Sequence, residues 1–279
     1  MSSVVLGGDS LGWIRRNLAQ PGGVFVTSQQ RIPYPEVSGY WIPTLLREGE
    51  TELALEFGRW LVADQGAEGA FTDPARTEPY VFDTGQVIRG LAALLDLLPE
   101  AERALRRACD WMLAMADAKG RLRTPRSLDA WAMGERGRCS EAIHLYALPG
   151  LIEAAERLDE PRYRDFARRS RDWYIANVVT DDFRRPEMLS HFFCYVQEAL
   201  VDLDAHDCAR RGMASLEQHR AASGAIPAYF DVSWICSPGS FQAAIIWAKL
   251  GEPRRAALAA LQHSAPGMLL VGAPQPGLS

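Results

Sequence analysis

Three acidic residues precede long apolar segments, and each lies beside aromatic or histidine residues. Glu36 lies in PYPEVSGYW, Asp83 in YVFDTGQ and Glu141 in RCSEAIH. Carboxyl groups gathered in an apolar surrounding repel each other when both ionise, so the pKa of one rises. That carboxyl can then donate a proton while another accepts one. These three residues are the candidate catalytic carboxyls, and His191, near the start of the apolar segment SHFFCYVQEAL, is the fourth candidate.

A second group of residues is suited to binding a saccharide. Aromatic rings stack on the C–H faces of pyranoses, and amide groups hydrogen-bond to hydroxyls. Arg89 is expected to hold a uronate carboxylate or to pair with a glutamate, and His144 either faces the same cavity as Glu141 or is a core histidine. The predicted substrate-binding residues are Tyr40, Trp41, Phe82, Gln86, Arg89, His144 and Trp234.

Helix capping is a competing explanation for the acidic residues. Asp, Ser and Glu favour helix N-termini because they accept hydrogen bonds from free backbone N–H groups and complement the helix dipole. Capping accounts readily for Asp83. It accounts less well for Glu36, which lies in a loop flanked by proline and glycine.

The elements that position these residues repeat about every 50 residues. In each unit an apolar segment is followed by an amphipathic one, in which residues such as Leu53, Phe57 and Trp60 recur at helical spacing. Segments that are apolar on most faces predict buried helices, and one-sided segments predict helices exposed on the outside. The expected buried helices include residues 81–98, 141–158, 190–203 and 240–250.

This alternation predicts an all-α fold, an (α/α)6-type toroid of helical hairpins in one domain covering residues 1–279. The first helix is expected over residues 10–19, and the tails 1–9 and 264–279 are expected to be irregular. Pro149 predicts a kink or a late helix start, and short extended pieces are expected at 24–27 and 226–229. In a toroid the buried helices all start at one end, so the candidate residues should converge on one mouth.

The last hairpin is predicted to be incomplete. The sequence supports about 11 helices, whereas six closed hairpins need one more, and the C-terminal stretch is rich in Pro and Gly. Either the ring closes with a gap, or a partner chain in a homodimer supplies the missing helix, or this helix is absent altogether.

Three motifs resemble those of a known family. PYPEVSGYWIPTLL, VFDTGQVIRGL and CSEAIHLYALPGL are similar to segments of the VpsJ-type polysaccharide biosynthesis proteins, and the similarity extends over residues 12–250. That family lies in the (α/α)6 toroid class, with unsaturated glucuronyl hydrolases and sugar 2-epimerases. The resemblance implies a role in bacterial exopolysaccharide or surface-glycan production, with Glu36, Asp83 and Glu141 at the matching polar positions. The C-terminal GAPQPGLS departs from the family pattern.

The composition of the chain limits the kinds of molecule that it is expected to bind. The 279-residue chain has a net charge of −5, which argues against nucleic acid or an anionic membrane as the main partner. No apolar run approaches the ~20 residues of a membrane span, and the first residues do not form a secretory signal. The five cysteines follow no disulfide pattern, so a reducing cytoplasm is expected.

Two other enzyme classes are alternatives. His191, Cys194 and Cys236 could supply the three ligands of a catalytic zinc, as in lanthionine cyclase-like toroids. Gln65, Gly69 and Phe71 resemble the repeat of terpene cyclases, but the acidic motif of those enzymes is absent. No phosphate loop, dinucleotide fingerprint or nucleophile elbow is present, so no cofactor is expected.

The sequence therefore predicts a protein that binds a saccharide in the toroid mouth and hydrolyses, eliminates or epimerises it by carboxylate acid–base chemistry. The alternative is a non-catalytic toroid that binds a glycan or a protein.

Overall fold

A computed structural model describes residues 8–19, 22–25, 31–74, 78–124, 140–185, 188–221 and 224–256. These residues form ten α-helices and one 3₁₀ helix, and they include only isolated β-bridges in place of a sheet. They fall into two compact units, residues 8–124 with 147–170, and residues 140–146 with 171–256. The expected tail 264–279, and most of the tail 1–9, lie outside the described residues.

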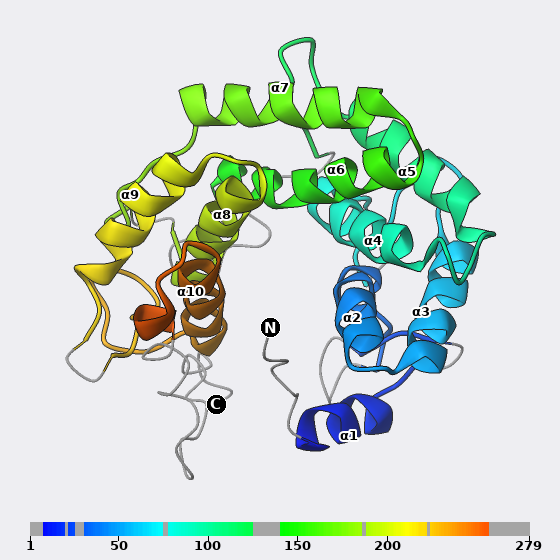
Figure 1. The fold of residues 1–279 in the computed structure, drawn as a ribbon, viewed down its shortest axis with the longest axis horizontal. Helices are drawn as coiled ribbons and strands as arrows, with labels where there is room; N and C mark the ends of the chain where they lie inside the picture. Colours follow the sequence, from blue (N-terminus) through cyan, green and yellow to red (C-terminus); the bar gives the residue numbers. More distant parts are fainter. Residues whose placement is uncertain are drawn as a thin grey trace, which may run out of the picture. The chain divides into compact units, whose positions relative to one another are not determined.

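The first unit consists of two layers of helices. Figure 1 shows α2, α4 and α6 in one layer, with α3 and α5 packed on it. The helices of this unit are α1 (Gly8–Arg16), α2 (Pro35–Arg47), α3 (Thr51–Asp64), α4 (Val81–Leu94), α5 (Ala101–Ala114) and α6 (Leu148–Arg157). The seventh helix, α7 (Pro161–Asn177), contributes residues to both units.

Glycines bring the first layer of helices close together. A Cβ atom on Gly39 of α2 would lie only 2.8 Å from the carbonyl oxygen of Gln86 in α4. In the same way, a Cβ on Gly150 of α6 would lie 2.9 Å from the carbonyl oxygen of Gly85. Only a residue without a side chain fits where backbones approach this closely. The first turns of α2 and α4, which carry Glu36 and Asp83, are thereby held next to each other.

The starts of α2 and α4 are built alike. Tyr34 and Tyr80 stand before them in extended backbone. In each helix a hydroxyl of the first turn also binds the chain that precedes the helix. Ser38 Oγ accepts a hydrogen bond from the Val24 N–H at 3.0 Å, and Thr84 Oγ1 accepts one from the Phe71 N–H at 3.0 Å. The sequence repeat is thus a structural repeat that presents equivalent helix starts.

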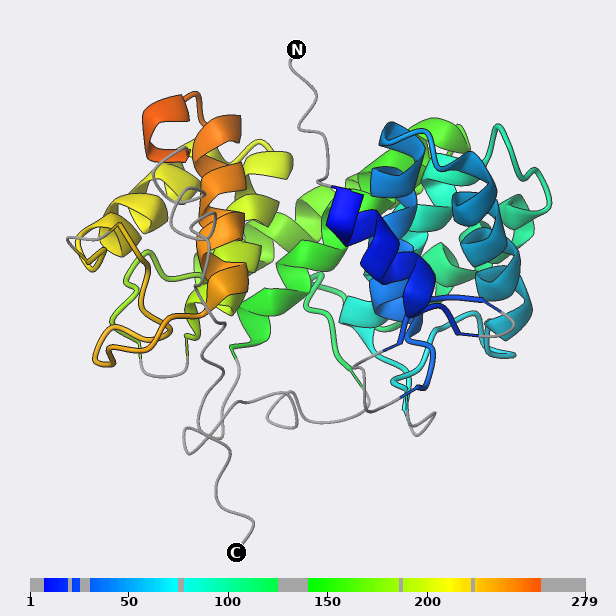
Figure 2. The ribbon, with the colours of Figure 1, turned by 90° about the horizontal axis from the view of Figure 1, so that it is seen from below.

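The second unit places a buried helix between two others. α8 (Ser190–Asp202) packs on α9 (His206–Glu217) and on α10 (Ser237–Lys249), and Figure 2 shows α8 and α10 side by side. The 3₁₀ helix η3 (Glu141–Ala147) also belongs to this unit, and α6 follows it directly along the chain. The predicted late helix start at Pro149 is confirmed, since α6 begins one residue before it.

The remaining predictions of secondary structure hold with shifted boundaries. The expected helix 10–19 runs from Gly8 to Arg16, and the expected helix 81–98 ends at Leu94. The extended pieces are present as bridges between Phe25 and Pro33 and between Pro227 and Ile235. After α10 the chain is helical again over residues 253–256, where the described residues end.

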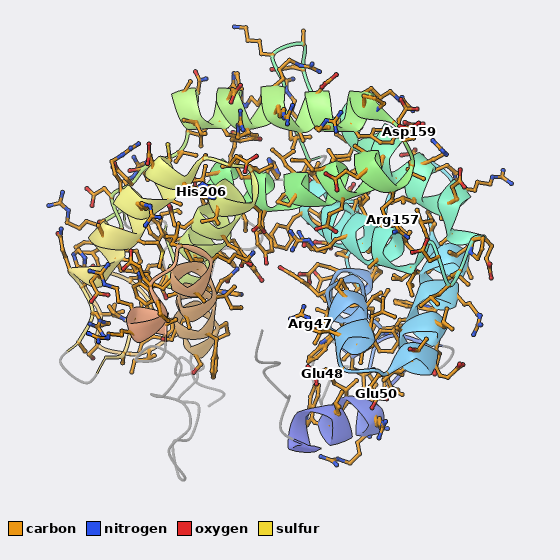
Figure 3. All side chains as sticks on the ribbon, viewed as in Figure 1. Arg47, Glu48, Glu50, Arg157, Asp159 and His206 are labelled. Atoms are coloured by element: carbon orange, nitrogen blue, oxygen red, sulfur yellow. The ribbon has the colours of Figure 1, made fainter. Side chains whose placement is uncertain are left out.

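The connections at the C-terminal ends of these helices are polar. Figure 3 labels Arg47 at the end of α2 with Glu48 and Glu50 in the connection to α3. It also labels Arg157 at the end of α6 and Asp159 in the connection to α7. The carboxylate of Glu50 pairs with Arg15 at 2.6 Å. Glu36 and Asp83 lie in the first turns of α2 and α4, so this end of the helices carries none of the candidate catalytic residues. Among the described helices, none is both long enough and apolar enough to span a membrane.

Candidate functional site

Two carboxyl groups and a tyrosine meet at the starts of α2 and α4. Asp83 is completely buried, and Glu36 retains 7% of its surface. The Tyr34 hydroxyl donates a hydrogen bond to Asp83 Oδ2 at 3.2 Å. The other carboxyl oxygen, Oδ1, is buried and has no hydrogen-bond partner in the described part of the chain. An uncompensated buried oxygen is costly if the group is charged, so this arrangement favours a proton on Asp83.

Burial is the main electrostatic influence on both carboxyls. Burial raises the pKa of Asp83 to about 8. The hydrogen bond from Tyr34 lowers this pKa, and the nearby Asp73 raises it by a smaller amount. Burial also raises the pKa of Glu36 well above its ordinary value, and the neighbouring Asp83 raises it further. Burial likewise raises the pKa of Tyr34, so its hydroxyl remains a donor. The two carboxyls interact, and they titrate as a pair.

This geometry bears on the capping explanation. The residues at the cap positions of α2 and α4 are tyrosines that make no side-chain cap hydrogen bond. Asp83 binds the Tyr34 hydroxyl rather than a backbone N–H. Capping therefore does not explain the carboxyl of Asp83.

The other predicted residues of the first unit lie along the same two helices. Gln86 is completely buried and Phe82 retains 5% of its surface, while Tyr40 and Trp41 are partly exposed. Arg89 forms an ion pair with Glu153 of α6, with 3.6 Å between Nε and Oε1. The pairing with a glutamate is thus present in the described structure, and the binding of a uronate carboxylate by Arg89 stays a prediction.

The remaining predicted residues belong to the second unit. Glu141 begins η3 and is partly exposed. His144 is 2% exposed, and its Nδ1 lies 3.0 Å from the Tyr174 hydroxyl, as expected of a core histidine. Trp234 packs edge-on against Tyr229 with 6.0 Å between ring centres. Catalytic and binding roles for these residues stay predictions.

His191 stands at the end of an aromatic row at the start of α8. Its ring lies 4.2 Å from that of Tyr195, which in turn lies 4.3 Å from the ring of Tyr146. Burial lowers the pKa of His191 to about 4, although Gln242 and Glu198 act in the opposite direction. The imidazole is therefore neutral near pH 7 and can accept or donate a hydrogen bond without carrying charge.

The polar group beside His191 was missed by sequence reasoning. Glu198 is 6% exposed and accepts hydrogen bonds from Tyr146 Oη at 3.3 Å, Gln242 Nε2 at 2.9 Å and Lys249 Nζ at 2.8 Å. A glutamate in the middle of an apolar helix was the signal available, because a buried carboxylate needs donors from neighbouring elements.

The proposed zinc ligands do not form a metal site. Within the described residues no group of three or more His, Cys, Asp and Glu side chains is arranged to hold a metal ion. Cys194 lies buried with its sulfur 3.6 Å from the carbonyl oxygen of Gly239. The alternative based on His191, Cys194 and Cys236 therefore gains no support from their arrangement.

Comparison with known proteins defines the fold class. No family model and no curated protein matches the sequence. An unsaturated glucuronyl hydrolase from Bacillus sp. GL1, described as responsible for the degradation of glycosaminoglycan, has a TM-score of 0.57 and 16% identity, covering 82% of this chain and 72% of its own. A second unsaturated glucuronyl hydrolase, specific for heparin, has a TM-score of 0.60 and 14% identity, covering 88% and 75%.

A third structure, described as a novel alpha-amylase from Clostridium perfringens, has a TM-score of 0.68 and 12% identity, covering 89% of this chain and 83% of its own. At such identities the similarity establishes the fold alone. The protein is all-α and of the (α/α)6 toroid class, as the sequence predicted.

Proposed function

We propose that this protein is a carbohydrate-active enzyme that acts on a saccharide through the carboxyl groups of Asp83 and Glu36. The observation that carries the proposal is the buried pair at the starts of α2 and α4, in which burial raises both pKa values. Paired carboxyls with one retained proton suit general acid–base catalysis near neutral pH. The similarity in fold to proteins described as glucuronyl hydrolases and an alpha-amylase agrees with a saccharide substrate.

The hydrogen bonding at Asp83 suggests how the two carboxyls divide their roles. Tyr34 occupies Oδ2, so Oδ1 is the oxygen free to carry a proton toward a substrate atom. Asp83 is then the acid. Glu36, whose pKa is also raised, serves as the base only in the singly protonated form of the pair. Such a pair serves hydrolysis, elimination and epimerisation alike, since each needs one proton given and one removed.

The finer assignment rests on the sequence motifs. Their resemblance to the VpsJ-type proteins supports a substrate from bacterial exopolysaccharide or surface-glycan metabolism. The five cysteines, which follow no disulfide pattern, support a cytoplasmic location. Sugar stacking by Tyr40, Trp41 and Phe82 and hydrogen bonding by Gln86 complete the proposed site. Glu141, His191 and Trp234, which belong to the second unit, remain candidate residues from the sequence.

The first substrates to test are unsaturated disaccharides prepared by lyase digestion of heparin and of other glycosaminoglycans. Loss of the conjugated double bond is followed by ultraviolet absorbance, and new reducing ends by chromatography. We expect turnover by the parent protein and at least a 100-fold loss in both Asp83→Asn and Glu36→Gln, in line with the contribution of general acid–base catalysis.

A matched control is Asp96→Asn, a surface carboxyl with an 80% exposed side chain that pairs with Arg157. It should retain full activity, and thermal denaturation should show that all variants are folded. Turnover that persists in folded Asp83→Asn would contradict the proposal.

One observation favours a second candidate, a saccharide-binding toroid without catalysis. The carboxyl of Asp83 has no exposed surface, so a substrate must displace neighbouring side chains to reach it. Calorimetric binding of the same disaccharides with no product after long incubation, and equal affinity in Asp83→Asn, would identify a binding protein.

A further inference from the structure

The second unit contains a chain of hydrogen-bonding groups that leads to His191. The carboxylate of Glu198 lies at its base, in the middle of α8, where three donors hold it. These are the Tyr146 hydroxyl, the side-chain amide of Gln242 and the ammonium group of Lys249. Lys249 also binds Asp202 at 2.6 Å, which fixes the ammonium group in turn. A carboxylate held by donors from two further elements has little freedom to move.

Glu198 decides which way the amide of Gln242 points. A carboxylate can only accept, so the NH₂ group of Gln242 must face it, and the observed distance from Nε2 to Oε2 is 2.9 Å. The carbonyl oxygen Oε1 must then face away from Glu198. It is buried, and it has no partner of standard hydrogen-bond geometry within the described residues.

His191 provides the complementary atom. Its Nδ1 is also buried without a partner of standard geometry in the described structure. Gln242 lies close enough to raise the pKa of His191, which is the effect of an acceptor beside the ring. The His191 ring also packs on Tyr195, which packs on Tyr146, and the Tyr146 hydroxyl donates to Glu198. The described groups around the imidazole thus leave one way to satisfy both atoms, an Nδ1–H that donates to Oε1.

We propose that Glu198 and Gln242 are positioning residues that fix His191 as the Nδ1–H tautomer, so that its Nε2 is left to accept a hydrogen bond from a substrate hydroxyl. The tautomer of a histidine is set by the partner of its other nitrogen. The ligand class is a saccharide, and this part of the inference rests on the proposed function. The positioning part does not depend on it.

The tautomer is read by nitrogen-15 NMR of the full-length protein, in which a protonated and an unprotonated ring nitrogen have distinct shifts. His191→Gln assigns the signals. We expect Nδ1 to be protonated and Nε2 unprotonated at pH 7, and Gln242→Met to give a mixture of the two tautomers. Glu198→Gln should also produce a mixture, because the amide of Gln242 is then free to turn.

The matched control is Gln197→Met. Gln197 is also a buried glutamine, but it lies on α8 and its side chain faces Gly212 of α9. This variant should leave the His191 signals unchanged. An Nε2–H tautomer in the parent protein, or an unchanged tautomer in folded Gln242→Met, would overturn the positioning role.

Binding is tested by titrating unsaturated heparin disaccharide into labelled protein. We expect the Nε2 signal to shift on binding, and Gln242→Met to weaken the affinity measured in this titration by about tenfold. If the Nε2 signal does not move at saturation although the protein still turns the disaccharide over, the assignment of Nε2 is overturned while the proposed function stands. If the protein neither binds nor turns over any saccharide tested, the proposed function is wrong. The tautomer measurement still decides whether Glu198 and Gln242 position His191.

Discussion

At the scale of single residues, the environment of Asp83 decides its chemistry. An aspartate in water is ionised near pH 7, but complete burial raises its pKa to about 8. The Tyr34 hydroxyl acts in the opposite direction, because a hydrogen bond to an oxygen of the carboxylate stabilises the charged form. The pKa of Asp83 is therefore set by a balance between burial and one hydrogen bond.

That balance predicts the effect of Tyr34→Phe. Removal of the hydroxyl takes away the group that lowers the pKa of Asp83, so this pKa should rise above about 8. An enzyme that needs Asp83 protonated should then keep its activity to higher pH. The measurement is kcat/KM against pH, with the fall on the alkaline side displaced upward in the variant.

A downward displacement, or identical profiles for two folded proteins, would show that Tyr34 does not tune Asp83. Tyr163→Phe serves as the control, since its hydroxyl donates to Asp110 and not to Glu36 or Asp83.

At the scale of the elements, α2 and α4 must stay in close contact for Glu36 and Asp83 to interact. Gly39 permits that contact, because a Cβ there would meet Val87 Cα at 2.8 Å as well as the Gln86 carbonyl. The obstacles are backbone atoms, which cannot turn aside as a flexible side chain can.

We therefore expect Gly39→Ala to destabilise the protein by roughly 1–3 kcal/mol and to reduce activity by separating the carboxyls. Gly12→Ala in α1 is the matched control. Its Cβ would meet only the end of the Arg16 side chain, at 3.1 Å, so it should be neutral or stabilising by up to about 1 kcal/mol. Urea denaturation measures both, and equal stability of the two variants would contradict the packing argument.

Helix periodicity made these helices predictable, but it did not predict which side chains from other segments contact them. Apolar residues on most faces of 81–98 and 190–203 correctly indicated buried helices, and Pro149 correctly indicated a late start. The donors around Glu198 come from segments about 50 residues away on either side, and no local pattern reports such contacts. For the same reason the sequence left open whether His144 belongs to the core, which its contact with Tyr174 now indicates.

At the scale of the whole molecule, the fold class followed from the repeat, and the chemistry depends on where the repeat places its polar residues. The all-α toroid class was predicted because each sequence repeat is too small to bury its own apolar face. Closure of the last hairpin by a partner chain in a homodimer stays a prediction, since the chain after residue 256 lies outside the described residues.

The stability of the whole protein should depend on pH through the buried groups. In the folded state Asp83 keeps its proton to about pH 8, whereas in the unfolded chain it loses it near 3.8. The unfolded state thus binds fewer protons in this window, and stability falls as the pH rises. His191, with a pKa lowered from 6.5 to about 4, acts in the opposite sense below pH 6.5.

The two effects oppose each other at acidic pH, so the net loss of stability should be clearest between pH 6.5 and about 8. Differential scanning calorimetry of the parent should show a falling Tm across this range. Asp83→Asn should make the fall less steep and leave the part due to Glu36, whose pKa burial also raises. A parent Tm that rises over the same range would be incompatible with a protonated buried carboxyl.

The central claim is that Asp83 holds a proton at neutral pH, and carbon-13 NMR of its side-chain carboxyl tests it most directly. With Asp83→Asn assigning the signal, the account predicts a protonated carboxyl at pH 7 and a midpoint near pH 8. A midpoint near the ordinary value of 3.8 would contradict the account.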